Sequence, residues 1–168
     1  MENILEQALK IKKSTIKKST HFAICNGDRI RYLVSLEKGK RKLVPIISSY
    51  SNASSINGNT QVGGIVGFLG DGSSIKSCIS ANEKVNATKD EVGRVYGATS
   101  GNATIGTMNT AEENKGLATM IVSKNGIQQL LEDSPQHGTN VGRSTLKLKS
   151  TYQGLGWNFT TNWTNQET

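Results

Sequence analysis

The aromatic residues near the C-terminus are the first candidates for binding chemistry. Four of the nine aromatic residues, Tyr152, Trp157, Phe159 and Trp163, lie in the last 17 residues. Exposed rings stack against the apolar faces of sugars, so Tyr152, Trp157 and Trp163 are candidate ligand-binding residues. Trp157 and Phe159 also alternate as on one face of a strand, and the alternative is therefore a hydrophobic lid over the end of the fold.

A second candidate binding feature is the basic N-terminal region. Residues 1–45 contain eleven Lys and Arg against four Asp and Glu, whereas residues 46–168 contain nine of each. The candidate anion- or nucleic-acid-binding residues are Lys12, Lys13, Lys17, Lys18, Lys38, Lys40, Arg41 and Lys42. Such patches attract phosphates and anionic surfaces. Lysine runs are also common in solvated tails, and only Phe22 and Tyr32 lie nearby to stack on bases.

The other patterns of polar and reactive residues carry no catalytic signature. The glycine-rich stretch 63–74 has neither a Gly-Lys-Ser/Thr ending nor a G-x-G-x-x-G pattern, so it does not predict a phosphate loop. His21 and Cys25 are four residues apart in a predicted strand, which separates them by roughly 13 Å. Asp90 and Glu91 fall in a predicted turn, where solvated charges are the default. No Cys/His cluster has metal-binding spacing, and we expect a non-enzyme without a cofactor or metal.

Composition restricts the elements that can position these residues. The chain has 168 residues, 35% hydrophobic residues and 18 glycines, which favours one turn-dense β domain over a helical bundle. No apolar run approaches the ~20 residues that a transmembrane helix needs. Residues 1–20 lack the apolar region of a secretory signal.

The first 47 residues are expected to form a basic N-terminal cap. Residues 2–13 place apolar side chains at helical spacing, which predicts a short amphipathic helix. Residues 21–47 contain β-rich stretches separated by turns at Asn26-Gly27-Asp28 and at residues 37–40. The domain prediction is therefore a helix and a small basic β segment over residues 1–47.

An internal repeat between residues 62 and 121 is the most informative pattern. A shift of 30 positions aligns apolar or glycine residues in one register: Val62 with Val92, Gly63 with Gly93, Ile65 with Val95, Gly67 with Gly97, Ile75 with Ile105, Cys78 with Met108, and Ala81 with Ala111. Stacked β coils produce this pattern, because inward side chains match the next layer while outward ones vary.

The resulting fold prediction is mainly β. Residues 48–121 are expected to form a short β-solenoid or β-helix-like repeat with a 30-residue period. Residues 122–168 are expected to form a C-terminal cap. Within it, Ile127, Leu130 and Leu131 have helical spacing and predict a short helix or turn within residues 125–138, followed by closing strands that carry the aromatic residues.

Residues 48–163 resemble the GLUG motif, a repeat of bacterial surface proteins. The resemblance rests on VGGIVGF (62–68), GSSIKSC, the degenerate copy VGRVYGA, in which Arg94 replaces a glycine, and the closing TYQGLGWNFTTNW (151–163). It implies a β-solenoid segment of an adhesin-like protein at the cell surface or secreted. The motif has no catalytic residues to carry over.

Two functional hypotheses follow. The first is a non-catalytic binding or structural module of the adhesin type, which recognises a host protein or glycan through its exposed β face. The alternative is an intracellular, cytoplasmic factor, encoded by a mobile element, which binds nucleic acid or protein through the basic N-terminal region. The exposed ends of stacked strands also predict homo-oligomer formation.

Overall fold

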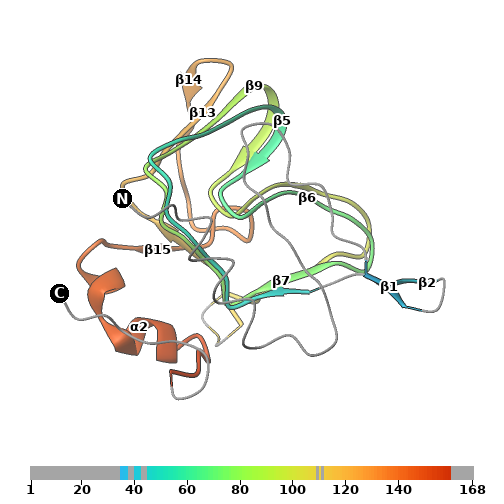
Figure 1. The fold of residues 1–168 in the computed structure, drawn as a ribbon. Coiled ribbons are helices and arrows are strands. Elements are labelled where there is room, and N and C mark those ends of the chain that lie inside the picture. The colour runs from blue at the N-terminus through green and yellow to red at the C-terminus, as the bar shows by residue number, and fades with distance from the viewer. Residues whose placement is uncertain (1–34, 38–39, 43–44, 109, 111, 160–168) are drawn as a thin grey trace, which may run out of the picture.

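The computed structural model describes residues 35–37, 40–42, 45–108, 110 and 112–159, and these residues are mainly β (Figure 1). The amphipathic helix expected over residues 2–13 lies outside the described residues. Strands β1 (Ser35–Glu37) and β2 (Lys40–Lys42) form an antiparallel hairpin separate from the other sheets. Glu37 pairs with Lys40, which confirms the predicted turn between them.

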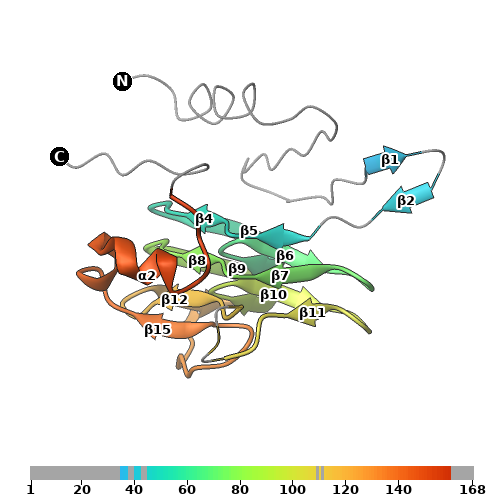
Figure 2. The same cartoon turned by 90° about the horizontal axis from the view of Figure 1, so that it is seen from below.

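Four sheets with parallel strand pairs make up the body. The first contains β3 (Ile46–Ile47), β7 (Ser74–Lys76) and β11 (Thr104–Ile105), and the second β4 (Tyr50–Ser51), β8 (Ile79–Ser80), β12 (Lys115–Leu117) and β15 (Thr139–Val141). The third contains β5 (Ile56–Gly63), β9 (Lys84–Gly93) and β13 (Ile121–Lys124), and the fourth β6 (Val66–Leu69) and β10 (Tyr96–Thr99). Figure 2 shows the strands of successive layers one below another, from β4 and β5 to β15.

The predicted pairing of Ile75 with Ile105 is confirmed. These residues are partners in the parallel pair of β7 and β11, and Val62 likewise pairs with Val92. Ile75 is fully buried, and Ile105 is partly buried against the same apolar cluster. Each fully buried Val, Leu or Ile stabilises a fold by about 1.5–3 kcal/mol. The matched apolar positions therefore account for the first two layers.

The predicted pairing of Cys78 with Met108 is wrong. After residue 106 the register changes, because Ile79 pairs with Lys115, a separation of 36 residues. Asn114 takes the place opposite Cys78: its Oδ1 accepts the Cys78 N–H at 3.0 Å, and its Nδ2 donates to the Ile75 carbonyl at 3.1 Å. The six extra residues form a loop, and the predicted partner of Ala81, Ala111, lies outside the described residues.

Close backbone approach explains the repeated glycines. A Cβ on Gly63 would lie 2.1 Å from the Val66 carbonyl oxygen, and one on Gly97 would lie 2.3 Å from the Gln61 carbonyl carbon. Only a residue without a side chain fits at such positions. The glycines therefore let β5 and β9 turn sharply into β6 and β10.

The C-terminal segment differs from the expectation. Residues 125–138 contain no helix. Instead β14 (Ile127–Gln128) pairs antiparallel with β13, and Asn125 and Gly126 at the turn have φ of 51° and 76°. Asn-Gly with two positive φ angles is the preferred hairpin turn, and it overrides the helical spacing of the apolar residues.

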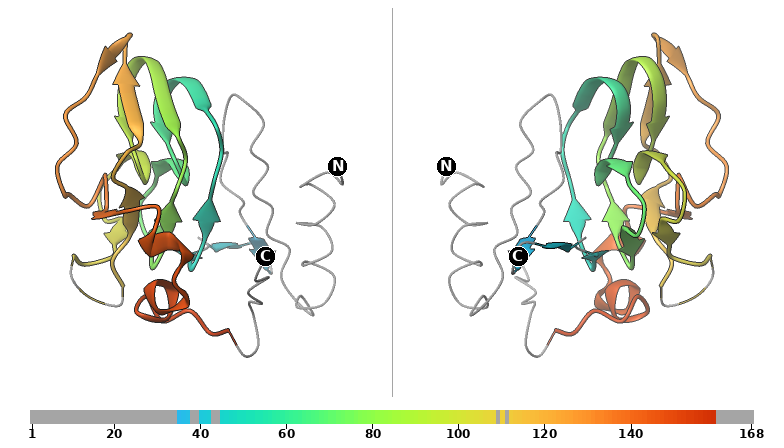
Figure 3. Two further views of the ribbon diagram at one scale, coloured as in Figure 1. Left: turned by 90° about the vertical axis from the view of Figure 1, so that its left-hand side faces the viewer. Right: turned by 90° about the vertical axis from the view of Figure 1, so that its right-hand side faces the viewer.

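The helical elements of the described chain come later, as the 3₁₀ turn η1 (Thr145–Lys147) and the short helix α2 (Lys149–Gln153). The closing strands expected over the aromatic region are absent from the described residues up to 159. Leu155 and Trp157, which follow α2, pack on Ile79 and Ala81 of the second sheet. Figure 3 shows the resulting arrangement, with α2 near one end of the molecule and the β13–β14 hairpin at the other.

Candidate functional site

The predicted aromatic platform is not an exposed surface. Trp157 is only 5% exposed, and its indole Nε1 donates to the Ser77 carbonyl at 2.8 Å. Tyr152 is half-buried, with its ring centroid 5.1 Å from that of Trp157, and its hydroxyl donates to the Leu146 carbonyl at 2.7 Å. The turn after α2, in place of a strand, directs Trp157 inward. Trp157 therefore offers no ring face to a sugar, and Trp163 lies outside the described residues.

The candidate basic residues are not brought into a described site. Lys12, Lys13, Lys17, Lys18 and Lys38 lie outside the described residues. Lys40, Arg41 and Lys42 form β2, whose backbone pairs with β1 and with no strand of the four larger sheets.

The outer face of the third sheet carries rows of polar side chains. Val85 and Ala87 of β9 are buried, so the alternating residues Asn86 and Thr88 point outward. Asn86 Nδ2 donates to Asn57 Oδ1 at 2.7 Å, and Ser123 Oγ donates to Asn86 Oδ1. Neighbouring strands lie about 4.8 Å apart, which allows such side chains to hydrogen-bond from layer to layer.

A second polar row lies beside the first. Thr88 Oγ1 donates to Asn59 Oδ1 at 2.7 Å, again between β9 and β5. We call the surface formed by Asn57, Asn59, Asn86, Thr88 and Ser123 the polar face. Its side chains hold one another in place, so their free donors and acceptors are presented in a fixed pattern.

Beside the polar face, β5 and β9 bend at equivalent positions. Gln61 and Glu91 have φ of 55° and 52°, in the left-handed region that side chains rarely adopt. In Figure 1, both strands curve away and return toward the middle of the molecule before the chain enters β6. The bend creates an inner angle between β9 and β10.

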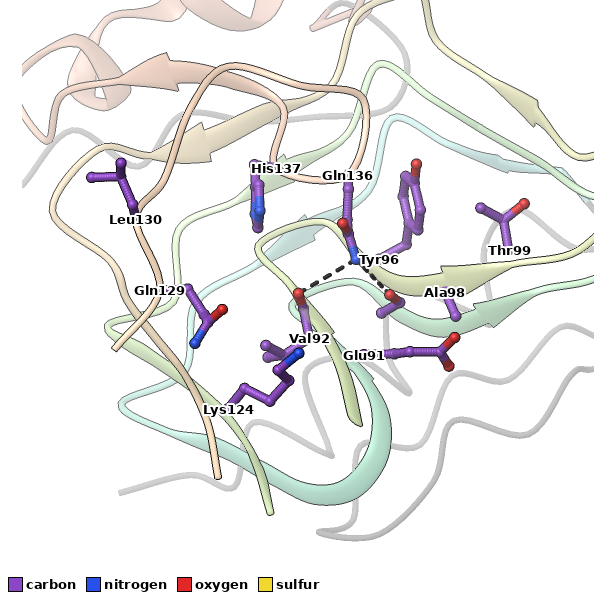
Figure 4. A pocket seen from close by; sticks show the side chains of 11 residues that line it. Glu91, Val92, Tyr96, Ala98, Thr99, Lys124, Gln129, Leu130, Gln136 and His137 are labelled. Carbon is purple, nitrogen blue, oxygen red and sulfur yellow. Dashed lines mark hydrogen bonds between the residues drawn. The ribbon is translucent and has the colours of Figure 1, made fainter. Parts of the chain in front are cut away.

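A cleft of about 480 Å³ occupies this inner angle. Its wall includes residues of β9, β10, β13 and the segment 129–137: Glu91, Val92, Tyr96, Gly97, Ala98, Thr99, Lys124, Gln129, Leu130, Gln136 and His137. Figure 4 shows Gln129 and Leu130 on one side of the cleft and Ala98 and Thr99 on the other. A second hollow of about 510 Å³ adjoins it and shares Glu91 and Lys124.

Hydrogen bonds fix one wall of the cleft. Gln136 Nε2 donates to the Gly97 carbonyl at 2.6 Å and to the Val92 carbonyl at 3.4 Å (Figure 4). His137 Nδ1 accepts the backbone N–H of Arg94 at 3.3 Å. The segment 134–138 is therefore held against the corner between β9 and β10.

Arg94 is the buried centre of that corner. Its side chain is fully buried, and its guanidinium donates to the carbonyls of Gly116, Leu117 and Gly138 and to Asn140 Oδ1, at 2.5–3.3 Å. Asp133 lies 3.9 Å away. Burial lowers the pKa of Arg94 from its ordinary value, and the Asp133 charge opposes this shift.

The Arg94 charge also acts on the neighbouring histidine. Burial, and then the Arg94 charge, lower the pKa of His137 below its usual range. His137 is therefore neutral at pH 7, consistent with its Nδ1 acting as an acceptor. Sequence reasoning found no partner for His137, although the replacement of a repeat glycine by Arg94 was a readable signal.

Cys78 is unsuited to nucleophilic chemistry. It is fully buried, and burial raises the pKa of its thiol to about 11. Its sulfur lies 3.1 Å from the Lys76 carbonyl oxygen. The thiol thus stays protonated at neutral pH, where the thiolate is the reactive form.

Two further searches concern the described residues alone. None of their helices has the length and apolar character needed to cross a membrane. No group of three or more His, Cys, Asp and Glu side chains in this part of the chain is arranged to hold a metal ion.

Comparisons of the chain with protein families, with curated proteins and with solved structures found no match. The functional interpretation therefore depends on the geometry and chemistry of the polar face and the cleft. Both features lie on the third sheet and its continuation into β10.

Proposed function

We propose that this chain is a non-catalytic binding module of the bacterial surface-adhesin type, which recognises a protein or glycan through the polar face. The observation that carries the proposal is the pair of hydrogen-bonded rows on β5, β9 and β13. A binding surface needs polar groups in fixed positions, because ordering them on binding costs affinity.

We further propose that the four sheets are the sides of a short β-solenoid. Its support is the strand order: the first three sheets each contain strands of successive layers in chain order, paired in parallel. The separation between partners is 29 or 30 residues for the first two layers, as in Ile46 with Ile75 and Tyr96 with Val66. Chain winding in one direction produces such an order.

The backbone beneath the polar face supports a role in recognition. Val85, Ala87 and Val122 are buried directly behind the face, in the same cluster as Val62 and Val92. A closely packed interior resists deformation, so the outward side chains keep their spacing. A ligand with repeated hydrogen-bonding groups can then contact several layers at once.

A pair of matched substitutions tests this proposal. Thr88→Lys places a long charged side chain on the polar face, while Thr104→Lys places the same side chain on β11 of a different sheet. Both threonines are exposed. We expect Thr88→Lys to reduce binding to a glycan array or to host cells at least tenfold, and Thr104→Lys to retain it within about twofold. Equal binding by both variants and the unmodified protein would contradict the polar face as the binding surface.

A further inference from the structure

We propose that the cleft and its adjoining hollow bind a neutral oligosaccharide. This inference rests on the proposed binding function and names its ligand class and site. The two hollows meet at Glu91 and Lys124 and so form one elongated depression along the bend of β5 and β9. Their volumes of about 480 and 510 Å³ suit a ligand larger than an ion or a single small molecule.

The depression presents unused hydrogen-bonding groups. Asp90, Glu91, Thr99 and Lys124 are exposed, and their side chains form no hydrogen bond or ion pair with any described residue. The charged pairs of the described chain lie elsewhere, for example Lys76 with Glu112 at 2.8 Å. The donors and acceptors of the depression are therefore available to a ligand.

The kinds of group present match sugar hydroxyls. Carboxylates accept, an ammonium donates, and hydroxyl and amide groups do both, so vicinal hydroxyls find complementary partners. Gln129 provides an amide, although its Nε2 already donates to the Ile127 carbonyl at 2.8 Å. Leu130, 86% exposed at the wall of the cleft, provides an apolar surface for the C–H face of a sugar ring.

The charge of the depression selects against acidic sugars. Asp90 and Glu91 carry two negative charges and Lys124 one positive charge, which leaves one net negative charge. The lowered pKa of His137 keeps its imidazole neutral at pH 7. Sialylated or sulfated chains would meet repulsion from both carboxylates, while a neutral chain would not.

The repeat positions the key side chains. Thr60 pairs with Asp90 and Val62 with Val92, so Gln61 and Glu91 lie at equivalent positions of adjacent layers. Both adopt the same left-handed backbone conformation and line the second hollow. The hairpin of β13 and β14 then supplies Lys124, and the segment that follows it supplies Gln129 and Leu130.

The test uses the full chain on an array of neutral, sialylated and sulfated oligosaccharides, followed by calorimetry with the best neutral binder. The cleft variant combines Glu91→Gln with Lys124→Met, which removes one charge of each sign at nearly constant volume. The matched control combines Glu112→Gln with Lys76→Met, which removes the exposed pair on another side of the molecule. Gln129→Ala serves as a milder second cleft variant.

We expect neutral oligosaccharides to bind, the cleft variant to raise Kd at least tenfold, and the matched control to stay within twofold. Gln129→Ala should raise Kd about threefold. Unchanged binding by both cleft variants, together with loss in Thr88→Lys, would overturn the cleft and leave the polar face standing. Binding of acidic sugars only, or of a protein partner only, would also overturn it. No binding to any glycan or host cell would overturn both proposals.

Discussion

The corner between β5 and β6 and the corner between β9 and β10 follow the same backbone path with different interiors. Gly63 pairs with Gly93, but the next residue is glycine in one layer and Arg94 in the other. At the first corner the space beside Gly64 is filled by Asn82, whose Nδ2 donates to the Gly64 carbonyl at 3.0 Å. At the second corner the Arg94 side chain itself fills the interior.

The two solutions differ in reach and in satisfaction. Asn82 is neutral, and its Oδ1 accepts from the Ala53 N–H and the Ser51 hydroxyl, both at 2.8 Å. Arg94 is a buried cation that contacts β12, β15 and the segment before β15, while its Nε has no partner among the described residues. One corner therefore joins adjacent layers, and the other holds three layers and one wall of the cleft together.

The largest expected effect comes from removing the cation. Arg94→Met leaves three carbonyl oxygens and Asn140 Oδ1 without their donor, and each buried unsatisfied group costs about 1–3 kcal/mol. We expect the free energy of unfolding to fall by about 3–5 kcal/mol, because relaxation recovers part of this cost. Urea denaturation measures it, and a loss below about 1 kcal/mol would contradict the assigned role.

The neutral corner should be less sensitive. Asn82→Ala removes the hydrogen bonds to Gly64, Ala53 and Ser51, but it orphans fewer buried groups and leaves a smaller cavity. We expect a loss of about 2–3 kcal/mol in the same urea experiment. A loss larger than that of Arg94→Met would reverse the comparison between the two corners.

A pH titration sharpens the comparison, because only the second corner includes a histidine. The pKa of His137 in the fold lies below the ordinary value of 6.5, so the unfolded chain binds its proton first as the pH falls. Stability from this group is therefore complete above about pH 6.5 and is lost as the pH falls from there through the lowered pKa. His137→Asn, which keeps an acceptor for the Arg94 N–H, should flatten this part of the profile. Identical profiles for both proteins would refute the assignment.

The smallest expected effect concerns the exposed ion pair of Lys76 and Glu112. Its side chains are 25% and 56% exposed, and exposed pairs contribute about 0–1 kcal/mol. Removing both partners together should therefore change the free energy of unfolding by less than about 1 kcal/mol. A loss comparable with that of Asn82→Ala would show that the loop after residue 106 depends on this pair.

The register of the first two layers could be predicted from the sequence. Val62, Ile75 and Gly63 face the same environment as their partners 30 residues later, so equivalent positions require the same residue type. The change to 36 residues could not, because Met108 happens to be apolar where the 30-residue shift falls. The actual determinant is Asn114, whose amide joins two backbone groups of the preceding layer.

The cleft was less accessible to sequence reasoning. Glu91, Lys124 and Leu130 belong to separate stretches that only long-range strand pairing brings together. The charges of Asp90 and Glu91 were expected to be solvated, as turn charges commonly are. One signal was readable, since Asn125-Gly126 is a strong hairpin turn, and it would have replaced the helix expected in residues 125–138.

A cysteine cross-link tests most directly the claim that equivalent residues of successive layers lie side by side on the polar face. Asn57 and Asn86 are partners in adjacent strands, within the Cα separation of about 4.4–6.8 Å that a disulfide spans. In a Cys25→Ser background, we predict rapid oxidation of the pair Asn57→Cys and Asn86→Cys. The control pair, Asn57→Cys with Ser123→Cys, lies two strands apart and should not cross-link. Equal cross-linking of both pairs, or of neither, would contradict the stacked register.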